Sequence, residues 1–430
     1  MKRIIYIFTF FLTFAMNANA EKKVFYVHGT FAESFIKNDS KHKLGSYRKY
    51  FTDKNGTLCW YDSDNNLHDI GTYCYNKYIK PQEVNNDIIL VGHSMGGSVC
   101  RTMLSKTSNI KGLITAGTAH YGNTFFVQLA NRQVNVFEFI DEMNNKSIKA
   151  KEESYTAAAN ALLSGWIADI VAKKIDEAHG KSMYNNGVFR SIFFDLLIPE
   201  FYGKYPCVSE MAENSNFNKN LNAQKINIPF INIYGAEDAW PFIRLLSTIK
   251  NQSDVNKFEN IDKTYDDEEV VKLNENLSKI SLAQDAHDIL YDVMSALSVV
   301  IWKYKSSKEL IKQARYNWDD LYRYIQYDMH EKIAKYNGSY QYEQRTYTYR
   351  LFGKTYTKTA IVGITRENDG MNSDKTVMLP ESMAGAGGRI WNERALGANH
   401  MELCNHPNVK KIFENAYKGS YDKVFNLQQQ

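Results

Sequence analysis

The segment that most strongly indicates the fold is Asp87-Ile-Ile-Leu-Val-Gly-His-Ser-Met-Gly-Gly97. Its apolar residues 88–91 predict a strand buried on both faces of a parallel sheet, because short apolar runs with β-branched residues are typical of that setting. The pattern G-x-S-x-G follows at 92–96 and is typical of a serine on a tight strand-to-helix turn. Apolar side chains at helical spacing in 98–105 favour a helix next. The stretch therefore predicts a nucleophilic Ser94 at the start of a helix.

A second strand, predicted at 24–27, runs into His28-Gly29-Thr30-Phe31. A glycine at a strand end lets the backbone curl so that an amide points toward the nucleophile. We expect the Thr30 N–H to be one donor to an oxyanion, with Phe31 as the alternative. The second donor should be the Met95 N–H, because this residue begins the helix after the nucleophile.

The N-terminus has the organisation of a secretory signal peptide. A basic start, Met1-Lys-Arg3, precedes the apolar run 4–14 and the small residues Ala18-Asn-Ala20. This order predicts cleavage after Ala20 and a secreted or periplasmic chain. The net charge of +4, with both signs mixed along the chain, gives no nucleic-acid-binding footprint.

Five cysteines fit an oxidising compartment, where disulfides persist. Cys59 and Cys74 lie in a polar, tyrosine-rich stretch that we interpret as a loop, so a local disulfide between them is the simplest pairing. Cys100, on the helix behind Ser94, is expected to be a buried free thiol. A pairing of Cys207 with Cys404 stays open.

Three motifs in order support a family resemblance. They are His-Gly-Thr at 28–30, Gly-His-Ser-Met-Gly-Gly at 92–97 and Gly-Thr-Ala-His-Tyr-Gly at 117–122. Together they resemble the bacterial lipase branch of the α/β-hydrolase superfamily, and the likeness resumes at 209–217 and in the C-terminal third. The resemblance implies an α/β-hydrolase fold with a mostly parallel central sheet, formed by a single domain over 21–430. His120, within the third motif, is interpreted as a structural residue.

Apart from 209–217, two long insertions match no motif of that family. The first, about 123–225, is larger than a connection between adjacent strands requires and is predicted to be an apolar helical cap. Phe189 and Phe193, in its apolar segment 188–198, would line an acyl-binding pocket under a lid that also touches a membrane or lipid surface transiently. Ordinary cap core is the alternative. The second insertion, about 251–365, predicts helices joined near Ser306-Ser307, then a β-hairpin over 345–362.

The catalytic base should be His400, which follows a predicted strand at 389–396 in Gly397-Ala-Asn-His-Met-Glu402. Two aspartates satisfy the chain order serine, acid, histidine. Asp238 follows the predicted strand 228–234, where this fold commonly holds its acid. Asp369 lies in Asn368-Asp-Gly370, and the resemblance implies an acid in such a motif about this far before the histidine. Both stay open, and either could be a turn carboxylate.

The expected chemistry is acyl transfer. A serine hydroxyl needs a base and an orienting carboxylate to become a nucleophile. The resemblance favours carboxylic esters, and lipid esters in particular. A thioesterase, amidase or acyltransferase on the same scaffold is an alternative, as is a non-catalytic binding protein. We expect no cofactor and no zinc; a structural calcium near Glu402, as in related lipases, is an alternative without evident partner ligands.

Overall fold

The computed structural model describes most of the sheet and much of both insertions. The described residues are 20–30, 56–124, 136–160, 172–182, 205–237, 304–351, 354–404 and 406–428, with scattered positions between 283 and 295. The expected signal segment 1–19 lies outside them, as do four candidate or alternative site residues: Phe31, Phe189, Phe193 and Asp238.

A six-stranded, wholly parallel sheet forms the centre, in the order β2-β1-β3-β4-β5-β8. The strands are β1 (Glu21–Val27), β2 (Thr57–Cys59), β3 (Asn86–His93), β4 (Ile110–Ala116), β5 (Pro229–Ala236) and β8 (Arg389–Leu396). β3 lies inside the sheet and its residues 88–93 are buried, as its apolar run predicts. The predicted α/β class with a mostly parallel sheet is confirmed.

Side chains alternate along each strand, so the sheet contributes to two hydrophobic cores. Ile88 and Leu90 of β3 face one core, while Ile89 and Val91 face the other. The first core is covered by α4 (Leu67–Cys74), α5 (Met95–Met103) and α10 (Pro206–Glu210), and the second by α19 (Pro407–Tyr417) and η8 (Lys423–Phe425). Shorter elements complete the described connections: η1 (Tyr75–Ile79), η2 (Lys80–Gln82), α11 (Asn216–Asn222), α18 (Asp374–Val377), η6 (Glu381–Met383) and η7 (Glu402–Cys404).

The expected disulfide between Cys59 and Cys74 is absent: all five cysteines are buried, and none of them forms a disulfide. The two residues do not share a loop: Cys59 ends β2, and Cys74 ends α4. Leu67, Ile70 and Cys74 recur at helical spacing on the buried side of α4, a pattern that the sequence already contains. Burial raises the pKa of the Cys59 thiol well above its usual value, which keeps it protonated.

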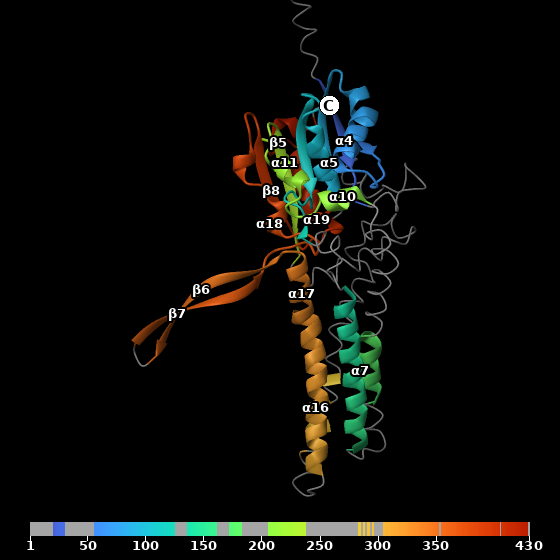
Figure 1. Cartoon of the computed structure of the whole chain (residues 1–430), viewed down its shortest axis with the longest axis vertical. Helices are drawn as coiled ribbons and strands as arrows, with labels where there is room; N and C mark the ends of the chain where they lie inside the picture. Colours follow the sequence, from blue (N-terminus) through green and yellow to red (C-terminus); the bar gives the residue numbers. More distant parts are fainter. Residues whose placement is uncertain are drawn as a thin grey trace, which may run out of the picture.

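Long helices from the two insertions come together in a helical stalk that extends away from the sheet (Figure 1). It contains α7 (Val136–Asn160) from the first insertion, with α16 (Tyr304–Arg323), η5 (Tyr324–Asp328) and α17 (Met329–Tyr336) from the second. The indole Nε1 of buried Trp318 donates to Ser154 Oγ at 2.8 Å. Lys146 Nζ lies 2.5 Å from Asp320 Oδ2, a second link between α7 and α16.

The connection expected near Ser306-Ser307 does not include these residues, because α16 begins at Tyr304 and both serines lie in its first turn; residues 296–303 before it lie outside the described residues. Serine is tolerated in a first helical turn, where its hydroxyl can bond the backbone. The predicted hairpin is confirmed and is longer than expected: β6 (Tyr340–Leu351) pairs antiparallel with β7 (Lys354–Thr365). Among the described residues, every helix is too short or too polar to cross a bilayer.

Candidate active site

Ser94 lies exactly between β3 and α5 in a conformation that serine rarely adopts, with φ 53° and ψ −127°. Such a backbone costs of order 1–3 kcal/mol and persists only where neighbours enforce it. The Ser94 N–H donates to the Ala116 carbonyl at 2.8 Å, and Thr118 Oγ1 donates to the Ser94 carbonyl at 2.8 Å. Both partners come from the end of β4 and the turn after it. The neighbouring strand therefore holds the serine at the positive end of α5.

Two glycines of the motif allow this turn to pack. A Cβ on Gly92 would lie 2.5 Å from the Gly97 nitrogen, and one on Gly96 would lie 2.2 Å from the Val27 carbonyl oxygen. Both distances are too short for any side chain. Gly29 is close as well, because its added Cβ would lie 3.0 Å from Ser94 Cβ. The glycines let β1, β3 and α5 meet around the serine.

Three side chains, brought together from distant parts of the chain, form a continuous hydrogen-bonded line. His400 Nε2 lies 2.9 Å from Ser94 Oγ, and His400 Nδ1 lies 2.8 Å from Asp369 Oδ2. Asp369 is 1% exposed and His400 is 2% exposed, so this pair is shielded from water. Asp238 is outside the described residues, so the structure gives no geometry for the alternative acid.

The loop that carries Asp369 fixes its carboxylate. The second oxygen, Oδ1, accepts from the backbone N–H groups of Met371 at 3.0 Å and Asn372 at 2.6 Å. The backbone of the same residue also accepts from the His400 N–H at 2.8 Å. One oxygen is thus held by the loop while the other faces the imidazole.

The contacts of His400 Nδ1 identify its tautomer. A carboxylate can only accept, so the 2.8 Å contact to Asp369 requires a proton on Nδ1. Asn372 Nδ2 is also 3.2 Å from Nδ1, but this amide donates to the Gly117 carbonyl at 3.0 Å. In neutral His400, Nε2 is then unprotonated and accepts from the hydroxyl of Ser94. This is the arrangement that a general base requires.

A reciprocal capping interaction holds the turn that carries His400. The Asn399 side chain accepts from the N–H groups of Met401 at 3.1 Å and Glu402 at 3.0 Å. Glu402 returns the contact, with Oε2 accepting from the Asn399 N–H at 3.1 Å. The sequence pattern N-x-x-E at 399–402 is a signal for such a capping box, and this role replaces the calcium ligand considered for Glu402 above. The buried Glu402 carboxylate therefore accepts a hydrogen bond within this turn.

His93 supports His400 from the other side. Its Nε2 donates to the His400 carbonyl at 2.9 Å, and the two rings lie 5.1 Å apart. Burial, with His400 nearby, lowers the pKa of His93 to about 3, so this imidazole is neutral. The residue before the nucleophile therefore fixes the backbone of the candidate base.

Tyr61, which no sequence motif identifies, holds the candidate oxyanion loop. Its hydroxyl donates to the His28 carbonyl at 2.5 Å, and its ring stacks on the His28 ring at 4.0 Å. His28 in turn donates from Nδ1 to the Gly29 carbonyl at 2.8 Å, and burial lowers its pKa to about 4. Thr30 follows directly, and its hydroxyl contacts the Met211 sulfur at 3.6 Å. Met95 is the first residue of α5, beside Ser94.

Comparison with known proteins agrees with this architecture. Residues 55–180 match the model of a family described as "PGAP1-like alpha/beta domain". Over this segment the chain is similar to that α/β domain, and its six-stranded parallel sheet is consistent with an α/β-hydrolase fold. No curated protein sequence gives a significant match.

Two solved structures are similar to this chain over about half of it. One is phospholipase PlaB from Legionella pneumophila, at 13% identity, covering 53% of this chain and 41% of that one, with a TM-score of 0.28. The other is a lipase-esterase related protein from Clostridium acetobutylicum ATCC 824, at 15% identity, covering 50% of this chain and 74% of that one, with a TM-score of 0.24. The chain spans less than half the length of the first.

His120 of the hydrolase domain lies in a separate buried network. Its Nε2 is 3.2 Å from Asn232 Oδ1, and its Nδ1 is 3.4 Å from the guanidinium of Arg101. Burial and the charge of Arg101 lower its pKa well below the ordinary value. His120 thus joins β4, β5 and α5. No group of three or more histidine, cysteine or acidic side chains within the described part of the chain could hold a metal ion.

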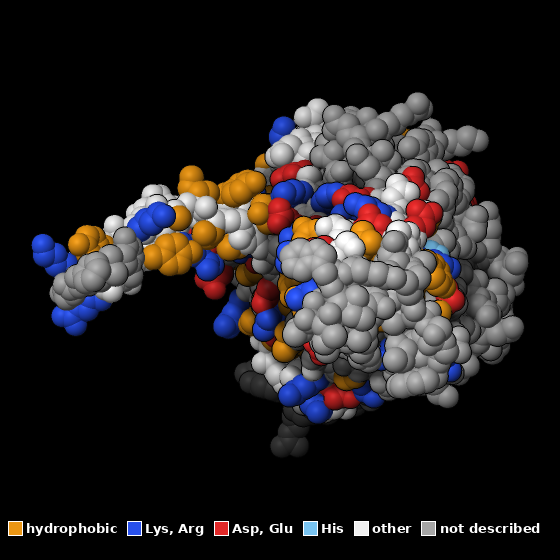
Figure 2. Space-filling view, turned by 90° about the horizontal axis from the view of Figure 1, so that it is seen from below, with side chains coloured by type: hydrophobic (Ala, Val, Ile, Leu, Met, Phe, Trp, Pro, Cys, Tyr) orange, Lys and Arg blue, Asp and Glu red, His pale blue; other side chains and the backbone are white. Residues whose placement is uncertain are grey.

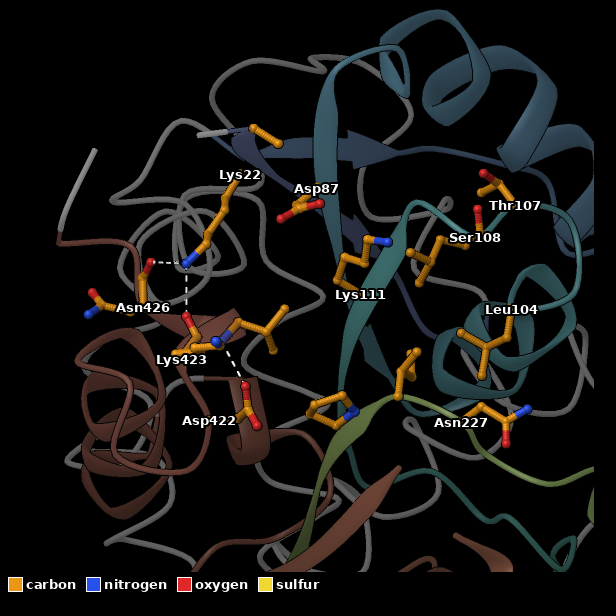
Figure 3. A pocket seen from close by; sticks show the side chains of 15 residues that line it. Lys22, Asp87, Leu104, Thr107, Ser108, Lys111, Asn227, Asp422, Lys423 and Asn426 are labelled. Carbon is orange, nitrogen blue, oxygen red and sulfur yellow. Dashed lines mark hydrogen bonds between the residues drawn. The ribbon is translucent and has the colours of Figure 1, made fainter. Parts of the chain in front are cut away.

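A cavity of about 810 Å³ opens at the opposite end of the strands (Figure 3). Its lining includes Lys22, Asp87 and Lys111, near the starts of β1, β3 and β4. Lys22 Nζ is engaged there, donating to the carbonyls of Lys423 and Asn426 at 2.8 Å each. Ser94 follows the other end of β3, so this cavity is separate from the candidate active site.

The capping box predicts an effect on catalysis without a contact to the reacting atoms. Replacing Glu402 by Ala should lower kcat for an ester substrate about 10-fold or more, because His400 loses the support of its turn. Glu402→Gln, which can still accept from the Asn399 N–H, should retain most of the activity. Steady-state kinetics of both variants would test this; equal activity in Glu402→Ala and the parent protein would contradict it.

Proposed function

We propose that this chain is a serine hydrolase that cleaves carboxylic esters through a Ser94, His400 and Asp369 triad. The observation that carries the proposal is the hydrogen-bonded line from Ser94 Oγ through both ring nitrogens of His400 to Asp369. A buried carboxylate that orients the imidazole and stabilises its charged form is the arrangement that activates serine in many unrelated hydrolases.

In the first half of the reaction, Ser94 Oγ attacks the ester carbonyl carbon while its proton passes to His400 Nε2. The tetrahedral intermediate then collapses: the bond to the leaving alkoxide breaks, and this oxygen takes the proton from Nε2. An acyl group remains on Ser94. Asp369 keeps its negative charge throughout and stabilises the transient imidazolium.

In the second half, water attacks the acyl carbon and gives a proton to His400 Nε2. Collapse of the second tetrahedral intermediate breaks the bond to Ser94 Oγ, which takes the proton back. We assign the oxyanion contacts to the backbone N–H groups of Thr30 and Met95. The Met95 assignment is supported by its place at the start of α5, where free amides and the helix dipole favour negative charge.

Lipid acyl esters are the substrate class that we propose. The support is the likeness of the motifs at 28–30, 92–97 and 117–122 to bacterial lipases, together with the apolar segment 188–198 of the first insertion. Apolar side chains near a hydrolase site favour acyl chains over polar substrates. Phe31, Phe189 and Phe193 are our candidates for acyl contact.

The choice of acid is open to a direct test. Asp369→Asn should lower kcat by about 10⁴-fold, because an amide favours the wrong tautomer of His400. Asp238→Asn is the matched control and should keep nearly full activity. Hydrolysis of nitrophenyl esters of short and long acyl chains, beside thioester and amide analogues, measures both the loss and the bond type. A large loss in Asp238→Asn alone would reverse the assignment.

We also propose that the chain is exported and cleaved after Ala20. The support is the order of basic, apolar and small residues in 1–20, and the start of β1 at Glu21, which leaves the sheet whole after cleavage. Expression in a bacterial host and N-terminal sequencing of the exported protein should find Glu21 first. Recovery of uncleaved protein in the cytoplasm alone would contradict this.

A further inference from the structure

The hairpin of β6 and β7 projects from the hydrolase domain (Figure 1). Each strand has 12 residues, and the ladder is continuous from the Tyr340–Thr365 pair to the Leu351–Lys354 pair. A two-stranded ribbon is only marginally stable in water, because neither of its faces is covered. A surface that packs against the ribbon would therefore stabilise it.

One face of this ribbon combines tyrosines with cations. Residues directly opposite one another share a face, and side chains alternate along each strand. The register places five such side chains together, which we name the tyrosine–cation face: Arg345, Tyr347, Lys354, Tyr356 and Lys358. All five are exposed, and Tyr347 lies directly opposite Lys358. Figure 2 shows hydrophobic side chains along the ribbon and blue Lys and Arg side chains toward its far end.

The other face also exposes apolar surface. Tyr342 is 70% exposed and Ile361 is 74% exposed, although both are large side chains. Near the base, Tyr340 lies over Gly363, where an added Cβ would be only 1.8 Å from the tyrosine hydroxyl. The base is thus packed, while the part beyond it presents aromatic and aliphatic groups to solvent.

The charge of the ribbon identifies the chemistry of a matching partner. Residues 340–365 contain four Lys and Arg and a single acidic residue, Glu343, which pairs with Arg345 at 3.1 Å. Cations at a sheet surface attract an anionic lipid leaflet. Tyrosine suits the same setting, because its ring enters the apolar boundary while its hydroxyl stays in the polar layer.

The base of the hairpin is joined to the candidate active site. Asp369 follows four residues after β7 ends at Thr365. The Arg366 N–H donates to the Ser339 carbonyl at 2.8 Å, and the Glu237 N–H donates to the Asn368 carbonyl at 3.0 Å. These bonds fix the ribbon to the loop that carries the triad acid and to the end of β5. A surface held by the ribbon would lie on the catalytic side of the sheet.

We propose that the hairpin docks the hydrolase on an anionic lipid surface through its tyrosine–cation face. The inference deepens the proposed function, on which it rests for the lipid substrate, and it places the lipid contact on the hairpin in addition to the cap. Binding itself needs no catalysis, so the two can be measured apart.

The test uses the full chain without its expected signal segment. Its cosedimentation is measured with vesicles of phosphatidylcholine alone and of phosphatidylcholine mixed with phosphatidylglycerol. Binding to the mixed vesicles only, weakened by added salt, is expected. Lys354→Gln with Lys358→Gln should reduce this binding roughly 30-fold, at the usual contribution of one Lys or Arg near such a surface. Tyr347→Ser should weaken the vesicle binding that remains at high salt concentration.

The matched control is Lys149→Gln with Lys312→Gln, which removes the same charge from exposed positions of α7 and α16. It should bind mixed vesicles like the parent, and all variants should hydrolyse a soluble short-chain ester at the parent rate, which shows that they are folded. Equal binding by the hairpin variant and the control overturns the proposal. So does a parent protein that ignores vesicles and instead self-associates through the hairpin in sedimentation velocity. The two proposals can also fail separately. If the protein binds vesicles through the hairpin but hydrolyses no ester, the docking inference is supported and the proposed function is overturned.

Discussion

The geometry of the candidate active site depends on how closely three backbone segments approach one another around Ser94. Gly92 and Gly96 remove the side chains that would separate β3, α5 and the end of β1. The space gained lets Ser94 keep a positive φ, and the end of β4 holds it there with hydrogen bonds. Packing of the surrounding sheet offsets the free energy of this strained backbone conformation. A hydroxyl fixed at a helix start can then face an imidazole supplied by a distant segment.

Local patterns in the sequence predict much of the fold. The apolar run of β3, the glycine spacing and the strand before His400 can each be read from short stretches of sequence, and the parallel sheet and hairpin are confirmed. The acid could not be chosen in this way, because Asp238 and Asp369 both follow plausible strand ends and only tertiary packing places Asp369 beside His400. The supporting roles of Tyr61 and Glu402 were missed, although the N-x-x-E pattern of 399–402 was a readable signal.

The insertions show the limit of such patterns more clearly. Helical spacing predicts that a helix forms but not which partner it packs against, so the pairing of α7 with α16 was invisible in the sequence. Trp318 and Ser154 make that contact across 164 positions. The disulfide error has a different cause, because the helical spacing of Leu67, Ile70 and Cys74 is a local signal that places Cys74 on the buried side of α4 and not in a loop. Helices from the two insertions thus form one stalk, from which the hairpin projects in a different direction (Figure 1).

We propose that His400 makes Ser94 nucleophilic. Fluorophosphonate labelling with peptide mapping by mass spectrometry tests it most directly, because the reagent forms a covalent adduct only with an activated serine. We expect one adduct, on the Ser94 peptide of the folded protein. The adduct should be lost in His400→Ala and after unfolding in urea. A folded protein whose Ser94 stays unlabelled, or whose labelling is unchanged in His400→Ala, would contradict it.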